Sequence, residues 1–211
     1  MNLLPILISL PLALATMLAC SPPALASMSP APVMSLTPLM SLAPPAKRPK
    51  CPEGRQPELV VKLSKKWSKV FHIPKSWIRS QAYVETQDRP NAVNPVTGAM
   101  GVMQIMPRTY EWLLPSLKKT KLAKSKLVKE TLLLDTGNPN DLMHPDLNIM
   151  MASYLMVILK RKFGNDHTNV AAAYDAGHVR IAKCLDEGTA FPAQVQEYLA
   201  RVEAAKRRGF M

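Results

Sequence analysis

Apolar residues recur every three or four positions over most of the chain after residue 56, which is the spacing of amphipathic helices. The pattern predicts one helix from Pro57 to Phe71 with lysines on its outer face, and a second that ends at Glu85. A further helix is predicted to begin at Pro107. Asp146 is predicted to cap a helix that runs to Phe163 and is ended by Gly164, and Asp166 to cap a helix from Val170 to Ala176. The last two helices are predicted around Cys184 and from Phe191-Pro192. The pattern indicates a mainly α single domain of packed helices over residues 57–211. At most a small hairpin is expected, over Gly98–Ile105.

The first residues form a different apolar stretch. Leu3 to Ala19 is short for a membrane span and is interrupted by prolines, and small residues follow at Ala24-Leu25-Ala26. This arrangement predicts a secretory signal peptide over residues 1–26, and therefore export to the periplasm or cell envelope. Two alternatives stay open: lipid attachment at Cys20, which follows Leu18-Ala19, and a short anchor that is never cleaved.

Residues 27–56 are rich in Pro, Ser, Ala and Met and contain a near-repeat around Met34 and Met40. Such a composition cannot bury enough apolar surface to fold, so the segment is predicted to be a disordered linker.

The formal net charge of +12 favours anionic partners, and no charged residue precedes Lys47. Nucleic acid is disfavoured because no segment interleaves basic and aromatic residues. A run of lysines lies between Lys118 and Lys129. It is interpreted either as a solvated helix face or as a contact with an anionic cell-wall polymer or membrane surface.

Cysteine and histidine spacing limits the other chemistry. Cys51 and Cys184 form an even pair in an exported chain, so they are a candidate disulfide, with two unrelated thiols as the alternative. The four histidines show no metal-binding spacing, and no nucleotide or nucleophile motif occurs, so no metal and no cofactor are expected.

A lone acid, Glu85, ends the second predicted helix next to the apolar residues of segment 100–105. An apolar environment raises the pKa of a carboxyl group, and a carboxyl that is protonated near neutral pH can act as a general acid. Gly98 and Gly101 would allow backbone to approach a ligand closely, and a sugar could satisfy the hydrogen-bonding needs of Gln104. The alternative interpretation is a solvated glutamate beside a core segment.

Three ordered motifs extend this pattern along the chain. They read Glu85-Thr86 with Ala92-Val93-Asn94-Pro95 and Gly98 to Thr109, then Asn148-Ile149 with Tyr154-Leu155, then Ala172 to Gly177, followed by a weaker match over Gln194 to Leu199. Together they resemble the lytic transglycosylases of the soluble-lytic-transglycosylase type, which are related in fold to goose-type lysozymes. The resemblance implies a lysozyme-like fold, mainly α, with the small hairpin beside the active-site cleft. The departures are Thr86 for Ser, Asp175 for Asn and Gln194 for Glu.

The resemblance implies that Glu85 is the catalytic acid and base. It further implies that the glycan strand is contacted by Thr86, Gly101, Met103, Gln104, Tyr174, Asp175 and Tyr198. The implied reaction cleaves the β-1,4 bond between N-acetylmuramic acid and N-acetylglucosamine and leaves a 1,6-anhydro-muramyl end. Alternatives are a hydrolytic muramidase that uses Asp175 or Asp88 with water, and an inactive wall-binding domain of an envelope complex. A secretion, conjugation or phage assembly is a further candidate partner of this domain.

Overall fold

The computed structural model describes residues 54–208, all of which belong to one compact unit. Several predictions fall outside this range: the signal peptide, the lipid site at Cys20, most of the linker, and Cys51. These stay predictions.

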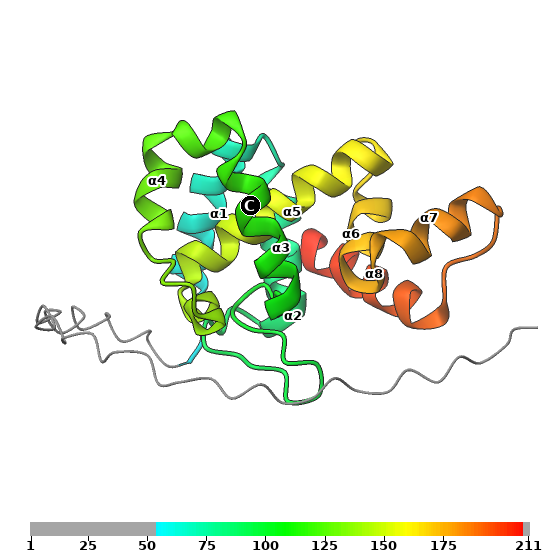
Figure 1. Cartoon of the computed structure of the whole chain (residues 1–211). Helices are drawn as coiled ribbons and strands as arrows, with labels where there is room; N and C mark the ends of the chain where they lie inside the picture. The colour runs from blue at the N-terminus through cyan, green and yellow to red at the C-terminus, as the bar shows by residue number, and fades with distance from the viewer. Residues whose placement is uncertain (1–53, 209–211) are drawn as a thin grey trace, which may run out of the picture. The chain divides into compact units, whose positions relative to one another are not determined.

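The domain is mainly α, as predicted (Figure 1). Between residues 54 and 208 the helices are α1 (Pro57–Phe71), α2 (Lys75–Thr86), α3 (Pro107–Lys118), α4 (Lys126–Leu132), α5 (Pro145–Phe163), α6 (His167–Ala176), α7 (His178–Asp186) and α8 (Ala193–Arg207). Two short 3₁₀ helices, η1 (Lys121–Lys124) and η2 (Pro139–Met143), join α3 to α5.

Local sequence signals account for most helix ends. A proline lies in the first turn of α1, α3 and α5, where its missing N–H costs nothing. The Asp166 side chain accepts a hydrogen bond of 2.8 Å from the backbone N–H of Thr168 and caps α6, as predicted, although the helix begins at His167. Gly164 follows α5 with φ 76°, which confirms that prediction too.

The predicted cap at Asp146 is wrong, because α5 begins at Pro145 and has His144 at its N-cap, two residues before Asp146. The Asp146 carboxylate instead accepts hydrogen bonds from Lys66 Nζ (2.7 Å) and Trp67 Nε1 (2.8 Å). Both partners lie on α1, so this acid ties α5 to the first helix.

Helix α5 is the centre of the fold: α1, α3, α4 and α6 pack against it, and α7 and α8 pack against α6 on the right of Figure 1. Its side chains from Leu147 to Ala152 are all fully buried. Burying a side chain the size of Leu, Ile or Met stabilises a fold by roughly 1.5–3 kcal/mol each. The long apolar helix therefore provides a rigid support for the shorter helices that carry the site.

The segment from Gln87 to Met106 is a loop in which the expected hairpin is reduced to isolated bridges. Met100 and Ile105 exchange two backbone hydrogen bonds of 2.9 and 3.0 Å, and no strand forms within residues 54–208. The loop connects α2 to α3 and lies against the end of α2 that carries Glu85.

Candidate active site

Glu85 lies in the last turn of α2, where this helix packs against α8. The Tyr198 hydroxyl on α8 donates a hydrogen bond of 2.7 Å to Glu85 Oε1. The Tyr198 hydroxyl also accepts a hydrogen bond of 3.3 Å from Gln81 Nε2, one turn before Glu85 on α2. Since Tyr198 is buried, its hydroxyl holds one oxygen of the carboxyl group in place from the side of the protein interior.

The surroundings of Glu85 raise its pKa from 4.5 to about 7. Burial is the largest cause, and the negative charge of Asp175 acts in the same direction. The Tyr198 hydrogen bond and the positive charge of Arg201 lower the pKa. Glu85 can therefore hold a proton near neutral pH and also release it, which a general acid and base requires.

Tyr174, for which the resemblance implies a contact with the glycan, forms a hydrogen bond within the protein. Its hydroxyl donates to the backbone carbonyl of Met103 at 2.8 Å, which fixes α6 to the loop. Burial and the nearby charge of Glu85 raise the pKa of Tyr174 well above its usual value. The Met103 side chain is fully buried in the core, so Met103 meets the site through its backbone rather than by lining the cleft.

Gly101 has φ 75° and lies against Asn148 of α5. A Cβ at this position would overlap the Leu142 carbonyl and the Asn148 side chain. Asn148 clamps the same turn, accepting from the Met103 N–H (2.7 Å) and donating to the Met100 carbonyl (2.9 Å). The close approach that the glycine permits here is therefore to protein, and a glycan contact at Gly101 stays a prediction.

Thr86 and Asp88 are buried and hold the start of the loop. The Thr86 hydroxyl donates to the Val102 carbonyl at 3.0 Å, so its side chain faces the loop backbone. Asp88 is completely buried and forms a two-bonded ion pair with Arg79, at 2.6 and 2.7 Å. A carboxylate held in this way cannot reach a substrate, which excludes Asp88 as a second catalytic acid.

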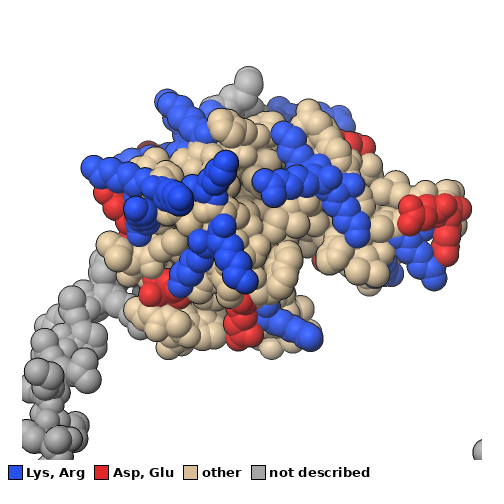
Figure 2. All heavy atoms as spheres, turned by 45° about the horizontal axis from the view of Figure 1, so that its top comes forward, with Lys and Arg blue, Asp and Glu red and all other residues tan. Residues whose placement is uncertain are grey.

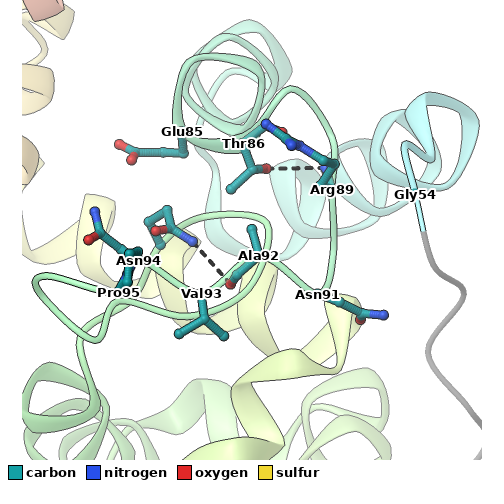
Figure 3. A pocket seen from close by; sticks show the side chains of 10 residues that line it. Gly54, Glu85, Thr86, Arg89, Asn91, Ala92, Val93, Asn94 and Pro95 are labelled. Atoms are coloured by element: carbon teal, nitrogen blue, oxygen red, sulfur yellow. Dashed lines mark hydrogen bonds between the residues drawn. The ribbon is translucent and has the colours of Figure 1, made fainter.

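A hollow of about 450 Å³ opens beside Glu85 (Figure 3). Glu85 lies on one side of it and the loop from Asn91 to Pro95 on the other. Gln104, with φ 48°, also lines the hollow, and its Nε2 donates to the carbonyls of Ala92 (3.2 Å) and Gly101 (2.9 Å). Protein groups thus orient Gln104 at the edge of the space beside the candidate acid.

Arginines around the site were not singled out from the sequence. Arg89 lines the hollow, and its Nε donates to the Thr86 carbonyl at 3.0 Å. The Arg201 guanidinium lies 5.7 Å from the centre of the Tyr198 ring. Partial desolvation of its carboxyl group raises the pKa of Asp175, whereas the charges of Arg201 and Arg180 lower it. Asp175 is exposed on α6, and the hollow is lined by other residues.

The remaining sequence predictions concern cysteines and metals. Cys184 is half-buried on α7 and forms no disulfide within residues 54–208, and Cys51 lies outside them, so their pairing stays a prediction. In the described part of the chain no three His, Cys, Asp or Glu side chains lie together as a metal site would need. None of the helices between residues 54 and 208 has the length and apolar character needed to cross a membrane.

These features define a class: a helical, lysozyme-like domain with a half-buried, protonatable carboxyl group, that of Glu85, beside a hollow. The transglycosylase SLT domain family matches residues 62–196, which is more than half of the chain. The chain therefore belongs to this family.

Similar proteins agree with this assignment. The chain is 29% identical over 133 residues to the soluble lytic murein transglycosylases of Escherichia coli and Salmonella typhimurium. The match covers 63% of this chain and only 18% of those proteins, so the chain corresponds to about a fifth of their length. Among solved structures, the 70 kDa soluble lytic transglycosylase of Escherichia coli superimposes with a TM-score of 0.55 at 25% identity, over 69% of this chain and 23% of that one. Its complex with bulgecin A gives a TM-score of 0.59 at 24% identity, over 71% of this chain and 24% of that one.

Proposed function

We propose that this protein is a peptidoglycan lytic transglycosylase. It cleaves the β-1,4 bond between N-acetylmuramic acid and N-acetylglucosamine and leaves a 1,6-anhydro-muramyl end. The observation that carries the proposal is Glu85 itself, whose pKa of about 7 and bond to Tyr198 suit one group that first gives and then takes a proton. The names of the related murein transglycosylases support the choice of substrate.

The reaction needs a single carboxyl group. Tyr198 occupies Oε1 of Glu85, which leaves Oε2 to carry the proton. Glu85 passes this proton to the glycosidic oxygen as the bond from C1 of the muramyl sugar to that oxygen breaks. The resulting carboxylate, stabilised by the Tyr198 hydroxyl, then accepts the proton of the muramyl 6-hydroxyl as the oxygen of that hydroxyl bonds to C1. No water is consumed, and the intramolecular nucleophile benefits from a high effective molarity.

Hydrolysis is the second candidate function, and the presence of an acidic residue, Asp175, near Glu85 favours it. This acid stands where the family pattern has an uncharged Asn, and it lies close enough to Glu85 to raise its pKa. A second carboxylate could activate a water molecule, as in inverting glycosidases. Since Asp88 is paired with Arg79, Asp175 is the acid on which this alternative depends.

The products distinguish these functions. Purified protein is incubated with peptidoglycan sacculi and the released muropeptides are weighed by mass spectrometry. A transglycosylase gives anhydro ends, which are lighter than hydrolysed ends by one water. Hydrolysed ends that disappear in an Asp175→Asn variant would instead support the muramidase.

Glu85→Gln is the control for catalysis of either kind. It should release no muropeptides while still binding sacculi. If the unchanged protein releases no muropeptides, and cells with the Glu85→Gln variant behave like cells with the unchanged protein, the domain is a wall-binding module of an envelope assembly instead.

The proposed site of action is the periplasm or cell envelope, where the substrate is found. The predicted signal peptide over residues 1–26 and the alternative lipid anchor at Cys20 both agree with this location. Mass measurement of the mature protein distinguishes cleavage after Ala26 from lipid attachment at Cys20.

A further inference from the structure

Residues 118–134, here called the lysine segment, form a strongly basic part of the surface away from the hollow at Glu85. The segment contains η1 and α4, and it carries one acidic residue, Glu130, against the lysines Lys118, Lys119, Lys121, Lys124, Lys126 and Lys129. None of these residues lines the hollow. Figure 2, which brings the top of Figure 1 forward, shows Lys and Arg side chains over much of that face and fewer acidic ones.

Few of these charges are neutralised by the rest of the domain. Lys118 pairs with Asp135 at 3.0 Å, and Lys126 lies 3.9 Å from Glu130 on the exposed side of α4. Within residues 54–208 no ion pair forms at Lys119, Lys121, Lys124 or Lys129, and all four are exposed. This leaves a local excess of positive charge that attracts anionic surfaces.

Apolar side chains project from the same segment. Val128 and Thr131 are buried and attach α4 to the domain, whereas Leu127 is 40% exposed and Leu133 is 81% exposed. A single exposed leucine is common on protein surfaces. Two of them among unpaired lysines match the composition of segments that lie in the interface of a membrane. A soluble acidic polymer would use the lysines but would gain nothing from the leucines.

We propose that the lysine segment is a membrane-contacting surface that binds anionic phospholipids. The lysines contact the headgroups, and Leu127 and Leu133 enter the boundary between headgroups and acyl chains. This inference is independent of the proposed function, because it uses no residue that contacts Glu85 or the hollow. This contact attaches the domain to the membrane through a surface separate from the hollow at Glu85, and keeps the domain at the membrane surface while the glycan is cleaved.

The test measures binding of the full chain to vesicles of phosphatidylcholine with and without phosphatidylglycerol, by co-sedimentation at about 0.1 M salt. The readout is the partition coefficient for vesicles with phosphatidylglycerol divided by that for vesicles without it. This ratio is used because the apolar N-terminal residues are common to all variants and can bind either kind of vesicle. The triple variant Lys121→Ser, Lys124→Ser, Lys129→Ser is compared with a control that removes the same charge from exposed positions away from α4. This control is Arg161→Ser and Lys162→Ser at the end of α5, with Lys183→Ser on α7.

We expect the first triple variant to lower the ratio on the order of 100-fold, since each lysine near an anionic surface contributes about fivefold. The control should keep the ratio within about threefold, because charges away from the contact are screened by salt. An equal loss in the two variants, or a ratio near one for the unchanged protein, would overturn the proposal.

The leucine is tested separately with a matched valine. Leu133→Ser should weaken binding to the anionic vesicles on the order of tenfold, as expected for losing one inserted aliphatic side chain. Val179→Ser on α7, whose side chain is 70% exposed, should leave that binding unchanged. Both positions are exposed, and circular dichroism checks that the helices remain. No effect of Leu133→Ser, together with full competition by soluble polyphosphate, would assign the segment to an acidic polymer and overturn the membrane contact.

Discussion

Replacing Glu85 by Gln should abolish glycan cleavage and at the same time make the domain more stable at alkaline pH. The substitution keeps the shape of the side chain and removes a carboxyl group that the fold holds in an unfavourable environment. Its pKa is raised from 4.5 to about 7, chiefly by burial. The folded protein therefore resists ionisation of Glu85, whereas the unfolded chain permits it.

The sign and size of the effect follow from these two pKa values. Because the pKa is higher in the folded state, the folded protein binds more protons than the unfolded chain between pH 4.5 and about 7, and its stability falls as the pH rises through that window. Each tenfold change in the ionisation constant corresponds to about 1.4 kcal/mol. Between pH 5 and pH 8 the unchanged protein should lose about 2.5 kcal/mol through this group, and Glu85→Gln should not.

The assay is urea unfolding of both proteins at pH 5, 6, 7 and 8, followed by circular dichroism. Other titrating groups are common to both proteins and cancel in the difference. Glu111→Gln, at an exposed position of α3, controls for the loss of one acidic side chain. A stability difference between Glu85→Gln and the unchanged protein that stays constant over this range would refute the raised pKa, and with it the proposed role as an acid.

Three further substitutions test the surroundings of the site. Tyr198→Phe removes a hydrogen bond to the ionised form of Glu85, so the alkaline limb of the pH–rate profile should move up by about one pH unit while the rate falls. Asp175→Asn removes a negative charge that raises the pKa of Glu85, so the same limb should move to lower pH; movement in the other direction would contradict the assigned electrostatics. Asp88→Ala leaves Arg79 buried without its carboxylate, and should lower the free energy of unfolding by about 3–5 kcal/mol in urea denaturation; a loss below about 1 kcal/mol would mean that the pair is not structural.

The helices and the acid were predictable from local sequence. Prolines and glycines mark helix ends within a residue or two, so the starts of α1 and α3 and the end of α5 follow directly from Pro57, Pro107 and Gly164. The raised pKa of Glu85 was also predicted, because the apolar residues of segment 100–105 follow it closely in the chain. These signals act over short sequence distances, where periodicity and turn chemistry are informative.

The partners of the acid were less accessible because they depend on packing between distant segments. The bond between Tyr198 and Glu85 spans 113 positions, and nothing near Tyr198 indicates which of its neighbours it meets. Gly101 illustrates the same difficulty. A glycine permits the close approach of either a ligand or another part of the protein, and the sequence does not show that Asn148 lies beside it. Asp146 looked like a cap by position, yet its carboxylate binds α1. In each case tertiary contacts decided between roles that the residue type alone permits.

The strength of the acid results from opposing contributions that come from different elements. The fold around α2 buries Glu85, and Asp175 on α6 adds a negative charge, and both raise the pKa. From α8, Tyr198 and Arg201 lower it. An Asn in place of Asp175 would leave the lowering contributions less opposed, so the aspartate offsets part of the effect of Arg201 while burial remains the largest cause. The proton affinity of a single carboxyl group is thus set by the packing of α6 and α8 against α2, and a change in either helix can adjust it without altering Glu85 itself.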